Sequence, residues 1–149
     1  MNPIVNLRDF LSDEQGVAMT EAIIVVPFLT FLAISVLEFG SVLWQREQIA
    51  TGMRDAARYM ARCRHSADTC QNVARNLAYY GSAAVTTRLR VRDWNADNSP
   101  ITFTESVSGS STIISATTTH QLPGSPLFSA LGIGNITVNA NHNQRKIGW

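Results

Sequence analysis

The sequence lacks the residue patterns on which most enzymes depend. It has no glycine-rich loop with a lysine, no H-E-x-x-H and no G-x-S-x-G turn. Its three histidines, His65, His120 and His142, fall in unrelated segments, where we expect each to be solvated or to cap an element. The two cysteines do not have the spacing of a zinc site. We therefore expect no catalytic residues, no cofactor, no metal and no small-molecule substrate.

A strong net charge is also missing. The 149 residues carry a formal charge of +1, so no overall field draws the chain to nucleic acid. The charge is unevenly spread, because residues 46–92 hold nine arginines against three acidic residues, a local +6. The row Arg88, Arg90 and Arg92 has no interleaved aromatic residues, so we interpret it as a solvated strand face or a protein contact. We expect no nucleic-acid partner.

Charge is absent altogether from residues 22–37, which are strongly apolar. A helix over residues 17–44 would be roughly 42 Å long, more than the hydrocarbon core of a bilayer, which is about 30 Å thick. We predict that this helix spans a membrane and that Pro27 kinks it. A carboxylate in such a run, as at Glu21 or Glu38, costs about 2.5–3.5 kcal/mol on insertion scales and needs a partner.

The start of the apolar run resembles the processing site of type IV prepilins. The matching residues are Gly16-Val17-Ala18-Met19-Thr20-Glu21. Further matches follow in order at Pro27, Leu37-Glu38-Phe39-Gly40 and Ala56-Ala57-Arg58-Tyr59. With these, the chain resembles the TadE-like proteins, the minor pseudopilins of Tad (Flp) type IV pilus systems. The resemblance covers about residues 13–63, a third of the chain.

The resemblance implies that a prepilin peptidase cuts after Gly16 and that the new amino group of Val17 pairs with Glu21 of a neighbouring subunit. Physical chemistry supports such a pair, because two charges that are each costly in lipid neutralise one another only when subunits stack in register. A glutamate near a helix end can instead reach the headgroups. For Glu38 that alternative is balanced against a subunit contact such as Arg46.

Two alternatives concern the N-terminus and the orientation. Residues 1–15 are acidic, unlike many prepilin leaders, and a conventional signal peptide ending after Ser35 is the competing interpretation. The arginines that follow the span favour a cytoplasmic C-terminal domain by the positive-inside rule. The prepilin-like motif and the cysteine pair favour a periplasmic one, which we adopt.

The cysteines Cys63 and Cys70 enclose six residues. In an exported domain we predict that they form a disulfide, the alternative being two reduced thiols in a helical turn. In a continuous helix their Cα atoms would lie about 10.5 Å apart, beyond the roughly 7 Å that a disulfide allows. The bond therefore requires the chain to bend within residues 64–69.

Beyond the apolar run, we expect the helix to continue to about Cys63 with two different faces. One stripe is apolar and the opposite face is basic; the stripe contains Ile49, Met53, Ala56 and Met60, and the basic face Arg54, Arg58 and Arg62. The small residues Gly40 and Gly52 permit another helix to approach closely. A second helix is predicted over residues 70–80, with Asp68 as its N-cap and Gly81 at its end.

From residue 84 the hydrophobic period changes to two, which predicts strands. The four alternating runs are residues 85–92, 101–107, 112–121 and 136–141. Residues 93–100 are turn-rich and residues 108–110 suit a tight hairpin. Between the last two strands, Ser125 and Pro126 can begin a short helix that stops at Gly132. Four strands with one apolar face each predict an antiparallel sheet packed on one side by helix.

These expectations describe an α+β, pilin-like protein with a prepilin-type leader (1–16), a transmembrane helix (17–44) and an extracytoplasmic domain (45–149), helical over 45–80 and a sheet over 84–144. The resemblance implies a minor pseudopilin, not an enzyme, that crosses the bacterial inner membrane once and contributes to pilus assembly by helix packing. Its implied partners are the membrane, the prepilin peptidase, other pilin or pseudopilin subunits and inner-membrane Tad assembly components. Entry into the pilus stays open. The alternative is an uncleaved, membrane-anchored binding module of the envelope.

Overall fold

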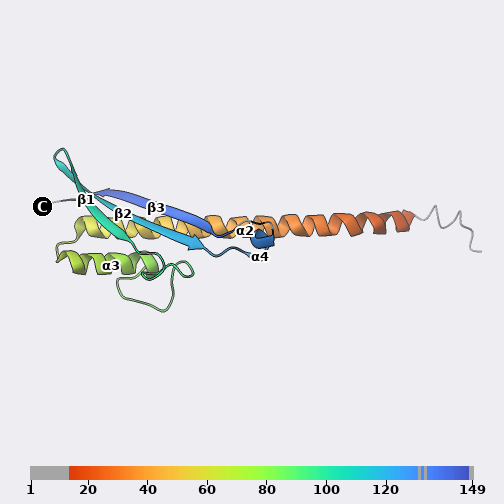
Figure 1. Ribbon diagram of the computed structural model, residues 1–149, viewed down its shortest axis with the longest axis horizontal. Coiled ribbons are helices and arrows are strands. Elements are labelled where there is room, and N and C mark those ends of the chain that lie inside the picture. Colours follow the sequence, from red (N-terminus) through yellow and green to blue (C-terminus); the bar gives the residue numbers. More distant parts are fainter. Residues whose placement is uncertain (1–13, 131, 133, 148–149) are drawn as a thin grey trace, which may run out of the picture. The chain divides into compact units, whose positions relative to one another are not determined.

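The computed structural model describes residues 14–130, 132 and 134–147. The chain divides into two units, Met1–Phe39 and Gly40–Trp149. Helix α2, Glu14–Arg62, contributes residues to both units (Figure 1). The other elements, helices α3 and α4 and strands β1, β2 and β3, belong to the second unit.

In the first unit, helix α2 is apolar on all sides and exposed. Large side chains such as Ile24 and Leu37 keep more than two thirds of their surface accessible, at 74% and 73%. Pro27 lies inside the helix, which continues past it. The hydroxyls of Thr30 and Ser35 donate to the carbonyl oxygens four residues earlier, each at 2.8 Å. The polar atoms of these two side chains are thus satisfied within the helix, as a lipid environment demands.

In the second unit, helix α2 packs its apolar stripe into the core beside helix α3, Ala67–Tyr80. The predicted stripe is confirmed, because Ile49, Met53, Ala56 and Met60 are all buried. The opposite face, with Arg54, Arg58 and Arg62, is exposed. The core is one cluster to which the two helices, the connection after α3 and the sheet all contribute.

Helix α3 ends where the sequence predicts. Gly81 has a left-handed backbone with φ of 71°, and its N–H donates to the carbonyl of Leu77 at 3.0 Å. The predicted N-cap is wrong, because the helix begins at Ala67 and its N-cap residue is Ser66. Asp68 lies in the first turn, where its negative charge still favours the helix dipole.

The sheet has three antiparallel strands in the order β1-β2-β3, with bounds Thr102–Ser108, Ser111–Leu122 and Ile136–Arg145. Strands β1 and β2 form the predicted hairpin, in which Ser108 pairs with Ser111 across a two-residue loop. Gly109 opens that loop with φ of 62°, a conformation that glycine adopts without strain. Figure 1 shows the strands crossing the C-terminal part of helix α2, with helix α3 drawn alongside that part of α2.

The short helix α4, Pro126–Ala130, joins strands β2 and β3. The hydroxyl of Ser125 accepts a hydrogen bond from the N–H of Phe128 at 3.2 Å, so the predicted cap is present. Gly132 follows with φ of 72°, and its N–H donates to the carbonyl of Ser129.

The strand predicted over residues 85–92 is wrong, and with it the four-stranded sheet. This segment is irregular, and Val85, which the alternation assigned to the core, is 68% exposed. The connection instead passes alongside the helices, where Val91 and Trp94 enter the core and the N–H of Arg90 donates to the carbonyl of Tyr79 at 2.7 Å. Alternation predicts a strand only where a neighbouring strand is available for pairing, and none pairs with this segment.

Trp94 is the largest fully buried side chain in the described structure. Its ring meets that of Tyr79 edge to face, with centroids 5.2 Å apart. The edge of the indole at Cη2 and Cζ3 lies against Gly52 of helix α2: a Cβ added to Gly52 would lie 2.7 Å from Cη2 and 2.7 Å from the carbonyl oxygen of Ala78. The glycine thus brings α2 close to α3 and leaves room for the indole.

Candidate assembly interface on helix α2

The most unusual surface of the described chain is the exposed apolar part of helix α2. Its exposed large side chains include Met19, Ile23, Ile24, Val26, Phe28, Leu29, Val36, Leu37 and Phe39. Within the described residues, Ala18–Arg62 is the one helix long and apolar enough to cross a membrane. An apolar surface of this extent needs lipid or other helices around it, because water does not solvate it well.

Glu21 is the first charged side chain in this apolar surface. It is exposed, and it makes no hydrogen bond or ion pair with any described residue. It follows Val17 by four residues, one helical turn, so the two positions share a face of the helix. A carboxylate in this position is a site that a positively charged group from outside can neutralise.

The predicted processing site lies at the edge of the described structure. Gly16 and Val17 belong to the first turns of helix α2, which begins at Glu14. The first thirteen residues of the proposed leader fall outside the described residues. Cleavage after Gly16 therefore stays a prediction.

The second predicted contact pairs Glu38 with Arg46 of another subunit. Glu38 is half-buried and Arg46 is exposed. Arg46 has no ion pair with a carboxylate among residues 14–130, 132 and 134–147. The pairing of Arg46 with Glu38 of another subunit stays a prediction.

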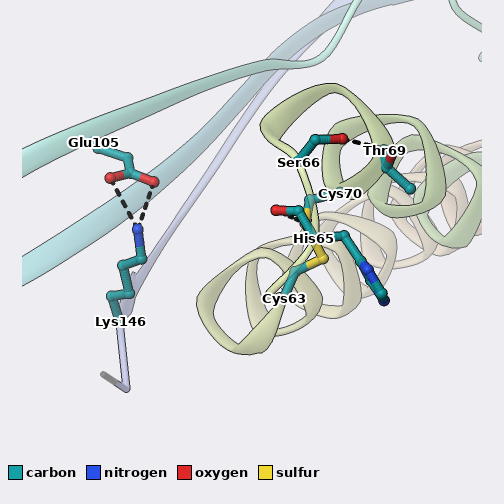
Figure 2. Close-up of a disulfide and its surroundings, with 7 residues drawn as sticks. All are labelled: Cys63, His65, Ser66, Thr69, Cys70, Glu105 and Lys146. Atoms are coloured by element: carbon teal, nitrogen blue, oxygen red, sulfur yellow. Dashed lines mark hydrogen bonds and ion pairs between the residues drawn. A yellow bond between two sulfur atoms is a disulfide. The ribbon is translucent and has the colours of Figure 1, made fainter. Parts of the chain in front are cut away.

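The predicted disulfide between Cys63 and Cys70 is present (Figure 2). Their Cα atoms are 5.9 Å apart, within the range of an unstrained bridge. The chain bends as this distance requires, because α2 ends at Arg62 and α3 begins at Ala67. The bridge fixes the corner between the two core helices.

The arginine row at residues 88–92 does not form the shared strand face that its spacing suggested. Arg90 turns inward and its Nη2 donates to Oδ2 of Asp55 at 2.7 Å, with side-chain exposures of 18% and 36%. Arg92 is exposed and lies 3.5 Å from the carboxylate of Asp93. The ion pair ties the irregular connection to helix α2.

The expectation that all three histidines are solvated or capping is wrong for His120. It is 2% exposed, and its Nδ1 is 2.7 Å from the hydroxyl oxygen of Ser99. Burial lowers the pKa of His120 below its ordinary value of 6.5. Tyr79 donates to the carbonyl of Ser99 at 2.8 Å, and burial raises the pKa of Tyr79 to about 12. These groups hold the connection in the core.

Trp94 and His120 are core residues that were not predicted from the sequence. Trp94 is an isolated residue in a polar segment and lies on no periodic apolar face. His120, in contrast, continues the period-two face of strand β2 on which Ile114, Ala116 and Thr118 are buried, and that alternation could have identified it. For Trp94 the local signal was Gly52, a glycine within a helical pattern, which often marks a close contact. The partner of that glycine could not be identified from local pattern, because Trp94 lies 42 residues further along the chain.

The fold and the exposed helix define a class of protein: an N-terminal apolar helix of membrane-spanning length joined to a small α+β domain. The family model described as TadE-like protein matches residues 16–58, and over this stretch the chain is similar to the TadE-like family. The resemblance drawn from the sequence is thereby confirmed. The match associates the chain with Tad pilus assembly, and the family is not a known enzyme family.

The matched stretch includes Glu21, Glu38 and Arg46 and ends before the disulfide and the sheet. No curated protein and no solved structure matches the chain.

Proposed function

We propose that this chain is a minor pseudopilin of a Tad/Flp pilus assembly system, cleaved after Gly16 and anchored in the bacterial inner membrane by residues 17–44. The observation that carries the proposal is Glu21, an exposed carboxylate in an apolar helix within the stretch that matches the TadE-like family. The domain from residue 45 onward would then lie in the periplasm. The disulfide supports that side of the membrane, since such bonds persist in oxidising compartments.

The mechanism follows from the cost of charge in lipid. Cleavage after Gly16 creates an α-amino group on Val17, which is protonated near neutral pH because its usual pKa is about 7.7–8.0. In hydrocarbon both this cation and Glu21 are costly when alone, and each offsets the other when a neighbouring helix brings them together. Assembly is then selective, because only subunits in the correct axial register make the pair.

A competing arrangement is a pair within one chain. Val17 and Glu21 are one turn apart, a spacing at which oppositely charged groups on a helix attract. Such a pair would neutralise the carboxylate without any neighbour and would give no drive for association. The two arrangements differ in whether loss of Glu21 reduces association between subunits.

The proposed partners follow from the same surface. The prepilin peptidase would act at Gly16, and other pilin or pseudopilin subunits and inner-membrane Tad components would pack against the apolar helix. Glu38 and Arg46 are the proposed second subunit contact. No catalytic residue is required of this chain, because helix packing and charge pairing perform the function.

The test combines processing with assembly in the native host. N-terminal sequencing of the mature protein should begin at Val17. Glu21→Ala should abolish pilus assembly or recruitment of the chain to the assembly machinery while the protein stays in the membrane fraction. A matched control is Glu47→Ala, which removes an exposed carboxylate outside the apolar run and should leave assembly unchanged. Normal piliation in Glu21→Ala, or a mature chain beginning at Met1 or beyond Ser35, would exclude the proposal.

A second candidate, an uncleaved envelope binding module, has one observation in its favour. A cleft of about 500 Å³ beside strand β2 is lined by polar side chains that include Asp93, Asn98, Gln121 and Asn135. In that function the domain would bind its ligand without cleavage after Gly16. N-terminal sequencing therefore separates the two candidates.

A further inference from the structure

Three arginines form a regular row on the outer face of helix α2. Arg54, Arg58 and Arg62, here called the arginine ladder, follow one another at intervals of four residues and are all exposed. The opposite face of the same turns, with Met53, Ala56 and Met60, is buried in the core. The ladder therefore faces away from the domain, on the part of helix α2 that lies beneath the sheet in Figure 1.

The ladder has no partner among the described residues. None of its guanidinium groups makes a hydrogen bond or an ion pair with any of them. The single acidic residue between positions 48 and 67 is Asp55, and its carboxylate is bound by Arg90 at 2.7 Å. Asp55, the carboxylate of helix α2 nearest to the ladder in sequence, is thus already paired with Arg90.

Like charges four residues apart destabilise a helix. The ladder contains two such pairs, Arg54 with Arg58 and Arg58 with Arg62, whose repulsion is offset in part by Asp55 and by the place of Arg62 in the last turn of the helix. A row of like charges that binds nothing among the described residues is a candidate for contact with an anionic partner.

We propose that the arginine ladder docks an acidic helix of another protein of the assembly, one that presents carboxylates at i, i+4 and i+8. Successive arginines rise about 6 Å along the axis, and carboxylates four residues apart on a second helix have the same rise. Arginine forms bidentate pairs with carboxylates, so three matched pairs would fix both the orientation and the axial register of the two helices. This contact rests on the function proposed above. It would set the axial register between neighbouring helices at a second place, outside the apolar run.

Lipid phosphate is the competing anion, and the geometry favours it less. Along the helix the rise from Trp44 is about 15 Å to Arg54 and about 27 Å to Arg62. The headgroup layer outside the hydrocarbon core is only about 5–8 Å thick on each side. Measured along the helix from Trp44, the ladder therefore begins beyond the thickness of the headgroup layer. Lipid phosphates in a fluid bilayer also present no fixed spacing that would match a four-residue repeat.

The test uses the full chain in nanodiscs of neutral phosphatidylcholine and two synthetic helical peptides of identical composition. One peptide presents glutamates at i, i+4 and i+8, and its isomer distributes them around the helix. We expect the first peptide to bind about tenfold more tightly than the isomer, and less tightly as salt is raised. Equal binding of the two peptides would overturn the proposal.

The variants separate the ladder from general positive charge. R54Q/R58Q/R62Q should reduce binding of the spaced peptide to the level of the isomer, while its melting temperature stays equal to or above that of the parent chain. The matched control R64Q/R88Q/R145Q removes three exposed arginines elsewhere and should bind normally. Loss of binding in the control, or none in the ladder variant, would overturn the proposal.

Two further measurements test lipid and a second copy of the chain as the ligand of the arginine ladder. Ladder-dependent binding to phosphatidylglycerol vesicles that exceeds binding to the spaced peptide would assign the ladder to lipid. Self-association of the chain that requires the ladder would assign it to a second copy. Either result overturns the acidic-helix proposal. Processing to Val17 and the effect of Glu21→Ala do not depend on the ladder, so a failure here is distinguishable from failure of the proposed function.

Discussion

Helix α2 contains two stretches that differ in where their stabilisation comes from. Residues 18–39 are apolar around the whole circumference and keep almost all of their side chains exposed. Residues 40–62 are amphipathic: an apolar stripe is buried in the domain, and arginines lie on the opposite, exposed face. The second stretch is stabilised by packing within its own chain, whereas the first needs lipid or other helices to cover it.

Two glycines of helix α2, Gly40 at the start of the second stretch and Gly52 within it, differ in a similar way. A Cβ added to Gly40 would meet nothing within 4 Å, whereas one added to Gly52 would collide with the carbonyl oxygen of Ala78 and with the ring of Trp94. The same residue type is therefore replaceable at one position of the helix and required at another. The requirement at Gly52 comes from its neighbours in space, not from the helix.

The largest expected effect on stability compares the buried Trp94 with the exposed Trp44. Trp94→Ala should lower the free energy of unfolding by about 3–5 kcal/mol, because it removes the largest buried side chain and leaves a cavity. Trp44→Ala should change it by less than about 0.5 kcal/mol, since Trp44 is 58% exposed. Calorimetry of the chain in detergent measures both. Equal losses would show that the exposed Trp44 of α2 and the buried Trp94 of the core do not differ as described.

A smaller effect is expected at the glycines. Gly52→Ala should destabilise the domain by about 1–3 kcal/mol, because the backbone of α3 and the indole ring must both move. Gly40→Ala should leave stability unchanged or raise it by up to about 1 kcal/mol, since alanine favours the helix. Denaturant midpoints at constant m-value provide the measurement. A stabilising Gly52→Ala would contradict the close packing of α2 with α3.

The smallest expected effect is the pH dependence of the stability of the folded domain. Burial holds the pKa of His120 below 6.5, so the native state keeps this histidine neutral while the unfolded state takes up a proton. Stability should be constant above about pH 6.5, fall as pH decreases below it, and level off below the native pKa. His120→Gln should remove most of this dependence, whereas His65→Gln, at an exposed position, should not. Melting temperatures between pH 4 and pH 8 test both.

Much of the helical architecture was predictable because it depends on local pattern. The apolar run, the buried stripe on α2, the end of α3 at Gly81 and the bend required by Cys63 and Cys70 all follow from periodicity, backbone preference or covalent geometry. The β1–β2 hairpin and the Ser125 cap are of the same kind.

The errors fall where a local pattern had two structural solutions. The alternation at residues 85–92 fits a strand, but it also fits an irregular segment that buries Val91 and uses Arg90 to bind Asp55. Asp68 and Ser66 are both residue types that cap helices, and in the structure Ser66 holds the N-cap position without a side-chain capping hydrogen bond, its hydroxyl being bonded to that of Thr69. His120 is polar yet buried on the inner face of β2, with Ser99 as the partner of its Nδ1 and no hydrogen-bond partner for its Nε2 among the described residues.

The amino-acid sequence by itself determined that this chain has a helix of membrane-spanning length, a carboxylate within its apolar run and a two-faced continuation of that helix. These features depend on residue type and period alone, since each is a property of consecutive turns. Only the tertiary structure decided that three strands pair, that Trp94 fills the space beside Gly52 and that the arginine ladder has no partner within the described chain. Those outcomes depend on contacts between residues far apart in the chain, which no local period encodes.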